Sequence, residues 1–200
     1  MHARLVTITG TDVNAVVRYL EDKVAPAVSQ HRGFRQLAAS GDRSRGLISI
    51  ISVWDSMADL EASESAVAKL REEGIDQYGG QATVAVFEQL ALGVGARGPE
   101  PGCVLRLVSF RADPGRFDDH TAWFNRDVLP AIVAAPGFRA ARLLGDRATG
   151  EGRVGTVYAD RASMEADDDA RARRMASAGD RGIELGELDV LEILFGMNAP

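Results

Sequence analysis

The residues best suited to chemistry are a histidine and a group of aromatic side chains in the second half of the 200-residue chain. One helix and two strands that are expected to pack together carry this group, whose members are His120, Trp123, Phe124, Asn125, Phe138 and Tyr158. An apolar pocket with a few polar groups is the usual form of a small-molecule site. We therefore predict that the aromatic residues and Asn125 bind a small apolar or aromatic substrate. His120 is the candidate catalytic residue, because a neutral imidazole can accept a proton near pH 7.

A structural interpretation of the same residues stays open. Phenylalanine at helical spacing usually packs in a core, and His120 lies beside the apolar stripe of its predicted helix. A histidine in that position can be buried or half-exposed without any catalytic role. The two interpretations differ in whether a cavity of mixed polarity exists between this helix and the sheet.

Other classes of site lack the residues that they require. The histidines His2, His31 and His120 stand far apart and Cys103 is the only cysteine, so we predict no metal site. The segment Gly93–Gly98 has the glycine spacing of a dinucleotide fingerprint, but prolines and then a strand follow it. That fingerprint must open a helix whose N-terminus faces the phosphates. We predict no cofactor.

The sequence is repeated after a shift of 104 positions. The shift superposes several short motifs, among them Pro26 on Pro130, Gly33-Phe34-Arg35 on Gly137-Phe138-Arg139, and Gly41-Asp42-Arg43 on Gly145-Asp146-Arg147. Two copies are too few for a solenoid, and they suit a duplicated small domain that packs as an internal pseudo-dimer.

The two copies differ at the candidate site. The first copy has Val16, Tyr19 and Leu20 where the second has a histidine, a tryptophan and a phenylalanine. Residues of the first kind are those that packing alone would favour. We therefore predict that a pocket, if present, lies in the second copy, between the helix at 114–135 and its sheet.

Each copy is predicted to fold as β-α-β-β-α-β. Alternating apolar and polar residues indicate strands, and apolar residues at a spacing of 3.6 indicate helices. The predicted strands of the first copy are 3–9, 34–40, 47–54 and 82–92, and its helices are 13–30 and 57–73. Those of the second copy are strands 103–110, 138–144, 153–159 and 185–195, and helices 114–135 and 161–178. The sequence thus predicts an α+β fold of two ferredoxin-like βαββαβ repeats, at 1–92 and 103–200, joined by a linker at 93–102.

Composition restricts the partners of the chain. The net charge is −6, and neither copy has the basic surface that nucleic-acid binding requires. No apolar run approaches the roughly 20 residues that cross a membrane, and no signal peptide is expected before the first strand. We expect a cytoplasmic protein with neither nucleic acid nor membrane as partner. The acidic run Asp167–Asp169 and the basic residues of 171–174 are expected to form a solvated, salt-bridged helix face.

Both copies resemble the dimeric α/β-barrel superfamily, in particular the antibiotic biosynthesis monooxygenase-like domains. In the second copy the resemblance rests on Leu129-Pro130, Pro136-Gly137-Phe138-Arg139, Leu143-Leu144-Gly145-Asp146 and Val157-Tyr158. It covers most of the chain. The resemblance implies that the two repeats pack sheet-to-sheet as an intramolecular pseudo-dimeric α/β barrel, with substrates held between helices and sheet. It also leaves room for further homo-oligomers.

The resemblance implies a monooxygenase-like protein, with cofactor-independent oxygenation of a small apolar or aromatic molecule as the leading activity. Haem-degrading relatives have an Asn on the first strand and a His on the second helix. In this chain neither predicted first strand contains an Asn, and neither predicted second helix contains a His. A further branch carries the signature Trp-aromatic-x-x-x-His-x-Pro, which matches Trp123–Pro130 except that Val128 replaces the histidine. The alternative is a non-catalytic ligand-binding or structural pseudo-dimer of the same fold.

Two aligned glutamates are expected to join the copies. Glu88 and Glu192 each lie on an apolar strand face, where a buried carboxylate needs a partner. In a barrel of this kind the fourth strand of one copy approaches the second strand of the other. We therefore predict ion pairs of Arg35 with Glu192 and of Arg139 with Glu88.

Overall fold

The computed structural model describes residues 1–199. Within them, eight antiparallel strands and the helices between the strands make an α+β fold, and the chain divides into two compact units. Unit 1 comprises Met1–Phe87 and the chain from Glu192 onward, and unit 2 comprises Glu88–Leu191. No helix in the described part of the chain is both long and apolar enough to cross a membrane.

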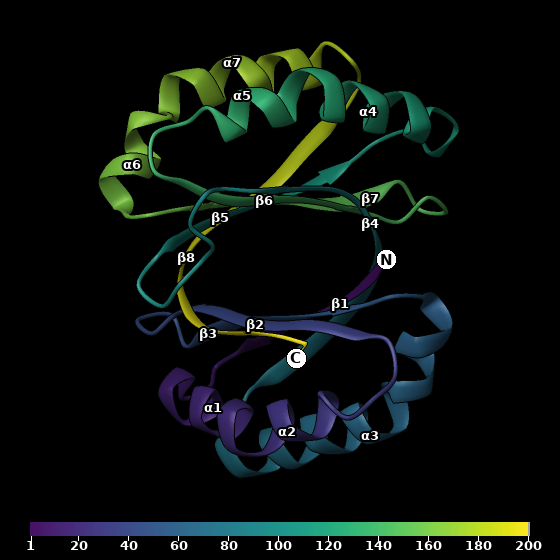
Figure 1. Ribbon diagram of the computed structural model, residues 1–200, viewed down its shortest axis with the longest axis vertical. Helices are drawn as coiled ribbons and strands as arrows, with labels where there is room; N and C mark the ends of the chain where they lie inside the picture. The colour runs from purple at the N-terminus through teal and green to yellow at the C-terminus, as the bar shows by residue number, and fades with distance from the viewer. Residues whose placement is uncertain (200) are drawn as a thin grey trace. The chain divides into compact units, whose positions relative to one another are not determined.

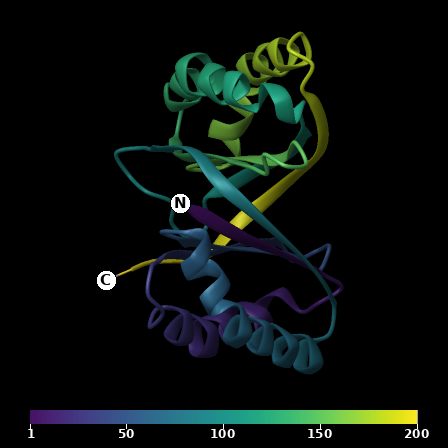
Figure 2. The same cartoon turned by 90° about the vertical axis from the view of Figure 1, so that its right-hand side faces the viewer.

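Unit 1 is a strand layer with helices on one face. Its elements are β1 (His2–Thr9), α1 (Val13–Tyr19), a π-helical turn (Leu20–Val24), α2 (Ala25–Val28), β2 (Phe34–Asp42), β3 (Leu47–Trp54), α3 (Met57–Tyr78), the first part of β4 (Gln81–Val94) and the last part of β8 (Glu184–Asn198). The strands lie in the order β4, β1, β3, β2, β8. Figures 1 and 2 show α1 and α2, in purple, and α3, in blue, side by side on the same face of these strands.

Unit 2 repeats this arrangement. Its elements are the second part of β4, β5 (Val104–Arg111), a 3-10 turn (Pro114–Arg116), α4 (Phe117–Trp123), a π-helical turn (Phe124–Val128), α5 (Leu129–Val133), β6 (Phe138–Gly145), β7 (Glu151–Tyr158), α6 (Arg161–Ala166), α7 (Asp168–Gly179) and the first part of β8. The strands lie in the order β8, β5, β7, β6, β4. Helices α4, α5 and α7 cover one face of them (Figure 1).

The predicted order of helices and strands is therefore found in both halves of the chain, with one irregularity that the periodicity did not indicate. Each first helix contains a π-helical turn just before a proline, Pro26 or Pro130. Proline has no N–H to continue the helical ladder. The backbone N–H before each proline instead bonds five residues back, from Ala25 to Leu20 and from Leu129 to Phe124. Such turns occur often at functional sites.

Strands β4 and β8 each begin in one unit and end in the other. Residues Glu88–Val94 pair with β6, and Glu192–Asn198 pair with β2. In these ladders Glu88 stands opposite Gly145 and Glu192 opposite Gly41. The arginine two positions past each glycine, in the following hairpin, reaches the glutamate. Arg43 lies 2.5 Å from Glu192 and Arg147 lies 2.6 Å from Glu88.

The partners predicted for these glutamates, Arg35 and Arg139, pair elsewhere, so that prediction is wrong. The Arg35 guanidinium donates two hydrogen bonds to Asp55, at 2.6 and 2.7 Å. Arg139 lies 3.3 Å from Glu100, in the connection between β4 and β5. Each of these two arginines thus pairs with a nearer acidic residue, and each glutamate pairs with the arginine of the adjacent hairpin.

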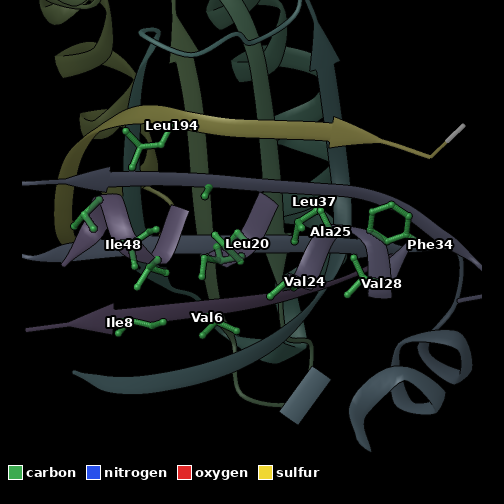
Figure 3. Close-up of a cluster of buried hydrophobic side chains, with 14 of the residues drawn as sticks. Val6, Ile8, Leu20, Val24, Ala25, Val28, Phe34, Leu37, Ile48 and Leu194 are labelled. Carbon is green, nitrogen blue, oxygen red and sulfur yellow. The ribbon is translucent and has the colours of Figure 1, made fainter. Parts of the chain in front are cut away.

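The core of unit 1 lies between its helices and strands. Figure 3 shows Leu20, Val24 and Val28 of the helical run beside the strands that carry Leu37 and Ile48, β2 and β3, and all of these side chains are buried. Burying one such side chain contributes about 1.5–3 kcal/mol. The helical spacing predicted from the sequence therefore determines which residues form this layer.

Candidate functional site: a cavity in unit 2

A cavity of about 120 Å³ lies within unit 2, between its helices and one face of its strands. An apolar cavity of about 150 Å³ can hold one benzene ring, so this space approaches the size of a single small aromatic ring. The lining residues are Leu90, Arg106, Val108, Phe110, Phe117, His120, Thr121, Trp123, Phe124, Val128, Ile132, Leu143, Val154, Thr156, Tyr158, Arg171, Arg174, Met175, Ala178, Ile183 and Leu185.

Simple periodicities bring these side chains together. Every second residue lines the cavity on β5, from Arg106 to Phe110, and on β7, from Val154 to Tyr158. Alternate residues of a strand share one face. On the helices the lining residues are mostly three or four positions apart, which places them on one face of each helix.

The structure brings four of the predicted site residues to this cavity. Trp123, Phe124, Tyr158 and His120 all line it, and all are buried. Two others lie elsewhere. Asn125 is exposed and donates a hydrogen bond of 3.0 Å to the carbonyl of Thr121. Phe138 is buried in the core of unit 2 and is not among the lining residues.

His120 is the histidine of the cavity. Burial lowers the pKa of its imidazole below the usual value, and Arg116 lowers it further, while the nearby Asp119 and Asp113 act in the opposite direction and Arg181 adds to the lowering. Within residues 1–199 no hydrogen bond is formed by its ring. The imidazole is therefore neutral at pH 7 and free to accept a proton.

A buried polar network borders the cavity, and sequence reasoning missed it. The Tyr158 hydroxyl donates a hydrogen bond of 2.7 Å to Asp167, and Arg174 donates another of 2.5 Å to the same carboxylate. The Arg106 guanidinium lies 5.7 Å from the centre of the Tyr158 ring and pairs with Asp168 at 2.5 Å. Burial, together with the Asp167 carboxylate, raises the pKa of Tyr158 far above its usual value. Tyr158 is thus a hydrogen-bond donor, not an anion, at neutral pH.

This network corrects the interpretation of residues 167–174 as a solvated helix face. Asp167 is only 2% exposed, and it interrupts the single helix predicted at 161–178 by separating α6 from α7. The ion pairs of the predicted face are present, and Asp168, Asp169 and Arg173 are exposed, but Arg171 and Arg174 line the cavity. The one signal in the sequence was Arg106 itself, a charged residue between Val104 and Val108 on one face of a strand.

Unit 1 has a smaller cavity at the corresponding place. Its volume is about 60 Å³, half that of the cavity in unit 2. Tyr19, which the repeat aligns with Trp123, lines it and donates a hydrogen bond of 3.0 Å to the carbonyl of Leu70. Val67 and Leu70 take the positions of Arg171 and Arg174. Unit 1 in turn has Arg71 where unit 2 has Met175, so arginines line both cavities, and unit 2 differs in its larger space and in the positions of its arginines.

Metal binding is not supported by the side chains of the described part of the chain. Among residues 1–199, no three His, Cys, Asp or Glu side chains are grouped so that they could hold a metal ion.

Comparisons with known proteins agree with the α+β fold. No protein-family model matches the chain. Two uncharacterized proteins, from two strains of Mycobacterium tuberculosis, are each 27% identical to it over 195 residues, which is 96% of this chain and 86% of each relative.

Solved structures give the stronger similarity. A proposed monooxygenase from Fusobacterium nucleatum superposes with a TM-score of 0.73 at 14% identity, covering 98% of this chain and 94% of the other. A proposed monooxygenase from Lactobacillus acidophilus gives 0.72 at 12% identity, covering 99% and 96%. An anthrone oxidase-like protein gives 0.67 at 16% identity, covering 99% and 93%. At such identities the likeness shows the fold alone: this chain shares its α+β fold with these three proteins.

Proposed function

We propose that this chain is a monooxygenase-like protein that binds a small aromatic molecule in the cavity of unit 2 and oxygenates it without a cofactor. The observation that carries the proposal is the cavity itself, in which aromatic side chains surround a neutral histidine. A core without a ligand would be expected to fill such a space, because protein interiors pack densely. The fold shared with proposed monooxygenases supports the same activity.

The chemistry follows from what the lining can do. His120 accepts a proton from an activated CH2 group of the substrate, and the resulting carbanion combines with dioxygen to form a peroxide anion. The protonated imidazole returns its proton to that anion, and the hydroperoxide loses water to leave a ketone. One substrate and one dioxygen thus give one ketone and one water. The protein supplies orientation, a water-poor space and the proton acceptor.

The test combines binding with oxygen consumption. We expect the wild-type protein to consume dioxygen with a one-ring probe such as phenylacetone, whose CH2 group is acidified by a carbonyl and a ring. Trp123→Ala should weaken binding of the probe, because it removes one aromatic wall of the cavity. His120→Ala should retain binding and reduce oxygen consumption by about 100-fold, the usual contribution of a general base.

The controls use residues outside the cavity. Asn125→Ala, on the exposed side of the same helical run, should leave both readouts unchanged. Binding without oxygen consumption would favour the alternative, a non-catalytic ligand-binding protein. Unchanged binding in Trp123→Ala would show that the probe binds outside this cavity and would overturn the proposal, and no binding by wild type would leave only a structural role for this chain.

The proposal includes the origin of the fold as a tandem duplication that packs as a pseudo-dimeric barrel. Matched features of the two units support it. Both have a buried arginine on the first strand, Arg4 or Arg106, whose guanidinium pairs with a glutamate or aspartate of the second long helical segment, Glu64 or Asp168. Small-angle scattering of the full chain tests the barrel, since two separated units would give a larger radius of gyration.

A further inference from the structure

Arg106 is the most unusual polar group of the cavity. Its side chain is only 6% exposed, and it lines the cavity wall. Its hydrogen bonds, to Asp168 at 2.5 Å and to the carbonyl of Met164 at 3.4 Å, both come from Nη2. The buried Nε and Nη1 atoms have no hydrogen-bond partner among residues 1–199. Unsatisfied buried donors are costly, and those of a charged group especially so.

The charges around the cavity are also unbalanced. Three arginines line it, Arg106, Arg171 and Arg174, and no carboxylate does. Arg174 is paired with Asp167 and Arg106 with Asp168, and neither aspartate is among the lining residues. Arg171 forms no direct ion pair in the described part of the chain; burial and the repulsion of Arg106 lower its pKa, while the nearby Asp168, which is already paired with Arg106, acts in the opposite direction. One positive charge at the cavity therefore lacks a counterion.

The cavity of unit 1 provides the comparison. Arg4, its buried arginine, donates hydrogen bonds from both Nη1 and Nη2, to Ser63 and to the carbonyl of Leu60. Glu64 lies 2.7 Å from Arg4 and 3.1 Å from Arg71, a second lining arginine, so the two arginines share this carboxylate. In unit 2 the repeat places Asp167 at the position of Ser63, and that carboxylate is occupied by Tyr158 and Arg174. Both cavities thus have buried arginine donors without a partner among residues 1–199, which in unit 1 are Nε of Arg4 and Nη1 of the lining Arg71. Arg106 differs from its counterpart Arg4 in that its Nη1 is orphaned as well as its Nε.

We propose that the cavity of unit 2 binds an aromatic monoanion whose charged oxygen accepts hydrogen bonds from Arg106 and is balanced by Arg171. This inference rests on the proposed function and narrows its substrate class to a small ring that carries an acidic group. The polar groups of the cavity then have two separate tasks. Arg106 holds the anionic oxygen beside Tyr158. His120, which has both arginines and aspartates as charged neighbours, is the proton acceptor.

The experiment compares two isosteric probes, benzoate and benzamide, by calorimetry at neutral pH on the full chain. Wild type should bind benzoate about 10- to 100-fold more tightly than benzamide, as expected for hydrogen bonds to a charged group. Arg106→Met should bring the two affinities to within about threefold of each other, and Arg106→Lys should restore part of the difference. Arg4→Met, which removes the matched arginine of unit 1, should keep the full preference for benzoate.

A second variant covers the case in which Arg106→Met does not fold. Arg171→Met removes the unpaired charge, and it should weaken benzoate binding by about tenfold without changing benzamide binding. Equal affinities for both probes in wild type, with both lost in Trp123→Ala, would overturn the anion site and leave the proposed aromatic pocket standing. Binding of neither probe would overturn both proposals.

Discussion

Filling the cavity of unit 2 should make the protein more stable and unable to bind a ligand. Ala178 is a buried lining residue near the end of α7. At about 24 cal/mol per Å³ of empty volume, a cavity of about 120 Å³ costs about 3 kcal/mol. Ala178→Leu adds three carbon atoms, and at about 0.8 kcal/mol for each the gain is at most about 2.4 kcal/mol. Side-chain entropy and local adjustment reduce it to about 1–2 kcal/mol.

The assay is urea unfolding followed by tryptophan fluorescence, with benzoate calorimetry on the same variant. A gain of 1–2 kcal/mol corresponds to a rise of about 2–8 °C in melting temperature for a protein of this size. The matched control is Ala172→Leu, an identical change at an exposed position of the same helix, which should shift stability by less than about 0.5 kcal/mol. The reasoning is refuted if Ala178→Leu destabilises the protein while benzoate binds as in wild type, because the space would then not be a ligand cavity.

Three further predictions follow from single side chains. Burial lowers the folded-state pKa of His120 below its unfolded value, so wild type should lose stability as the pH falls from the unfolded-state pKa to the folded-state pKa. Between pH 7 and pH 5, the free energy of unfolding of His120→Gln should therefore fall less than that of wild type in urea titrations. Tyr158→Phe removes a donor from the buried Asp167 carboxylate and should cost about 1–3 kcal/mol by the same unfolding assay; a neutral result would show that the hydrogen bond is unimportant. Arg147→Ala breaks the exposed pairs with Glu88 and Asp118 and should cost at most about 1 kcal/mol for each, an effect that high salt should reduce.

Much of the fold could be predicted because its causes are local. The alternation from Val104 to Phe110 and the helical spacing of Phe117, His120 and Phe124 each indicate one apolar face, and the structure has that face inward. Prolines, capping residues and glycine turns set the ends of the elements. The aromatic set was visible for the same reason, since a helix and two strands of known order must bring their apolar faces together.

The charged residues could not be predicted in this way. The sequence predicted a pair of Arg35 with Glu192, but Arg35 pairs with Asp55 and Glu192 with Arg43. Ion pairing depends on distances of a few ångströms, which the strand register and the hairpins determine. Asp167 was expected in solvent but is buried. Its carboxylate accepts hydrogen bonds from the Tyr158 hydroxyl of β7 and from Arg174 of α7.

The sequence by itself therefore determined the order of the elements and the aromatic wall of the candidate site. Only the tertiary structure decided that the cavity exists, that Asn125 and Phe138 do not line it, and that Arg106 lines it and has buried donors without a partner among residues 1–199. The physical reason is that the periodicity of neighbouring residues determines which apolar side chains are buried. A cavity or an unpaired charge instead depends on whether side chains from distant parts of the sequence reach the same place.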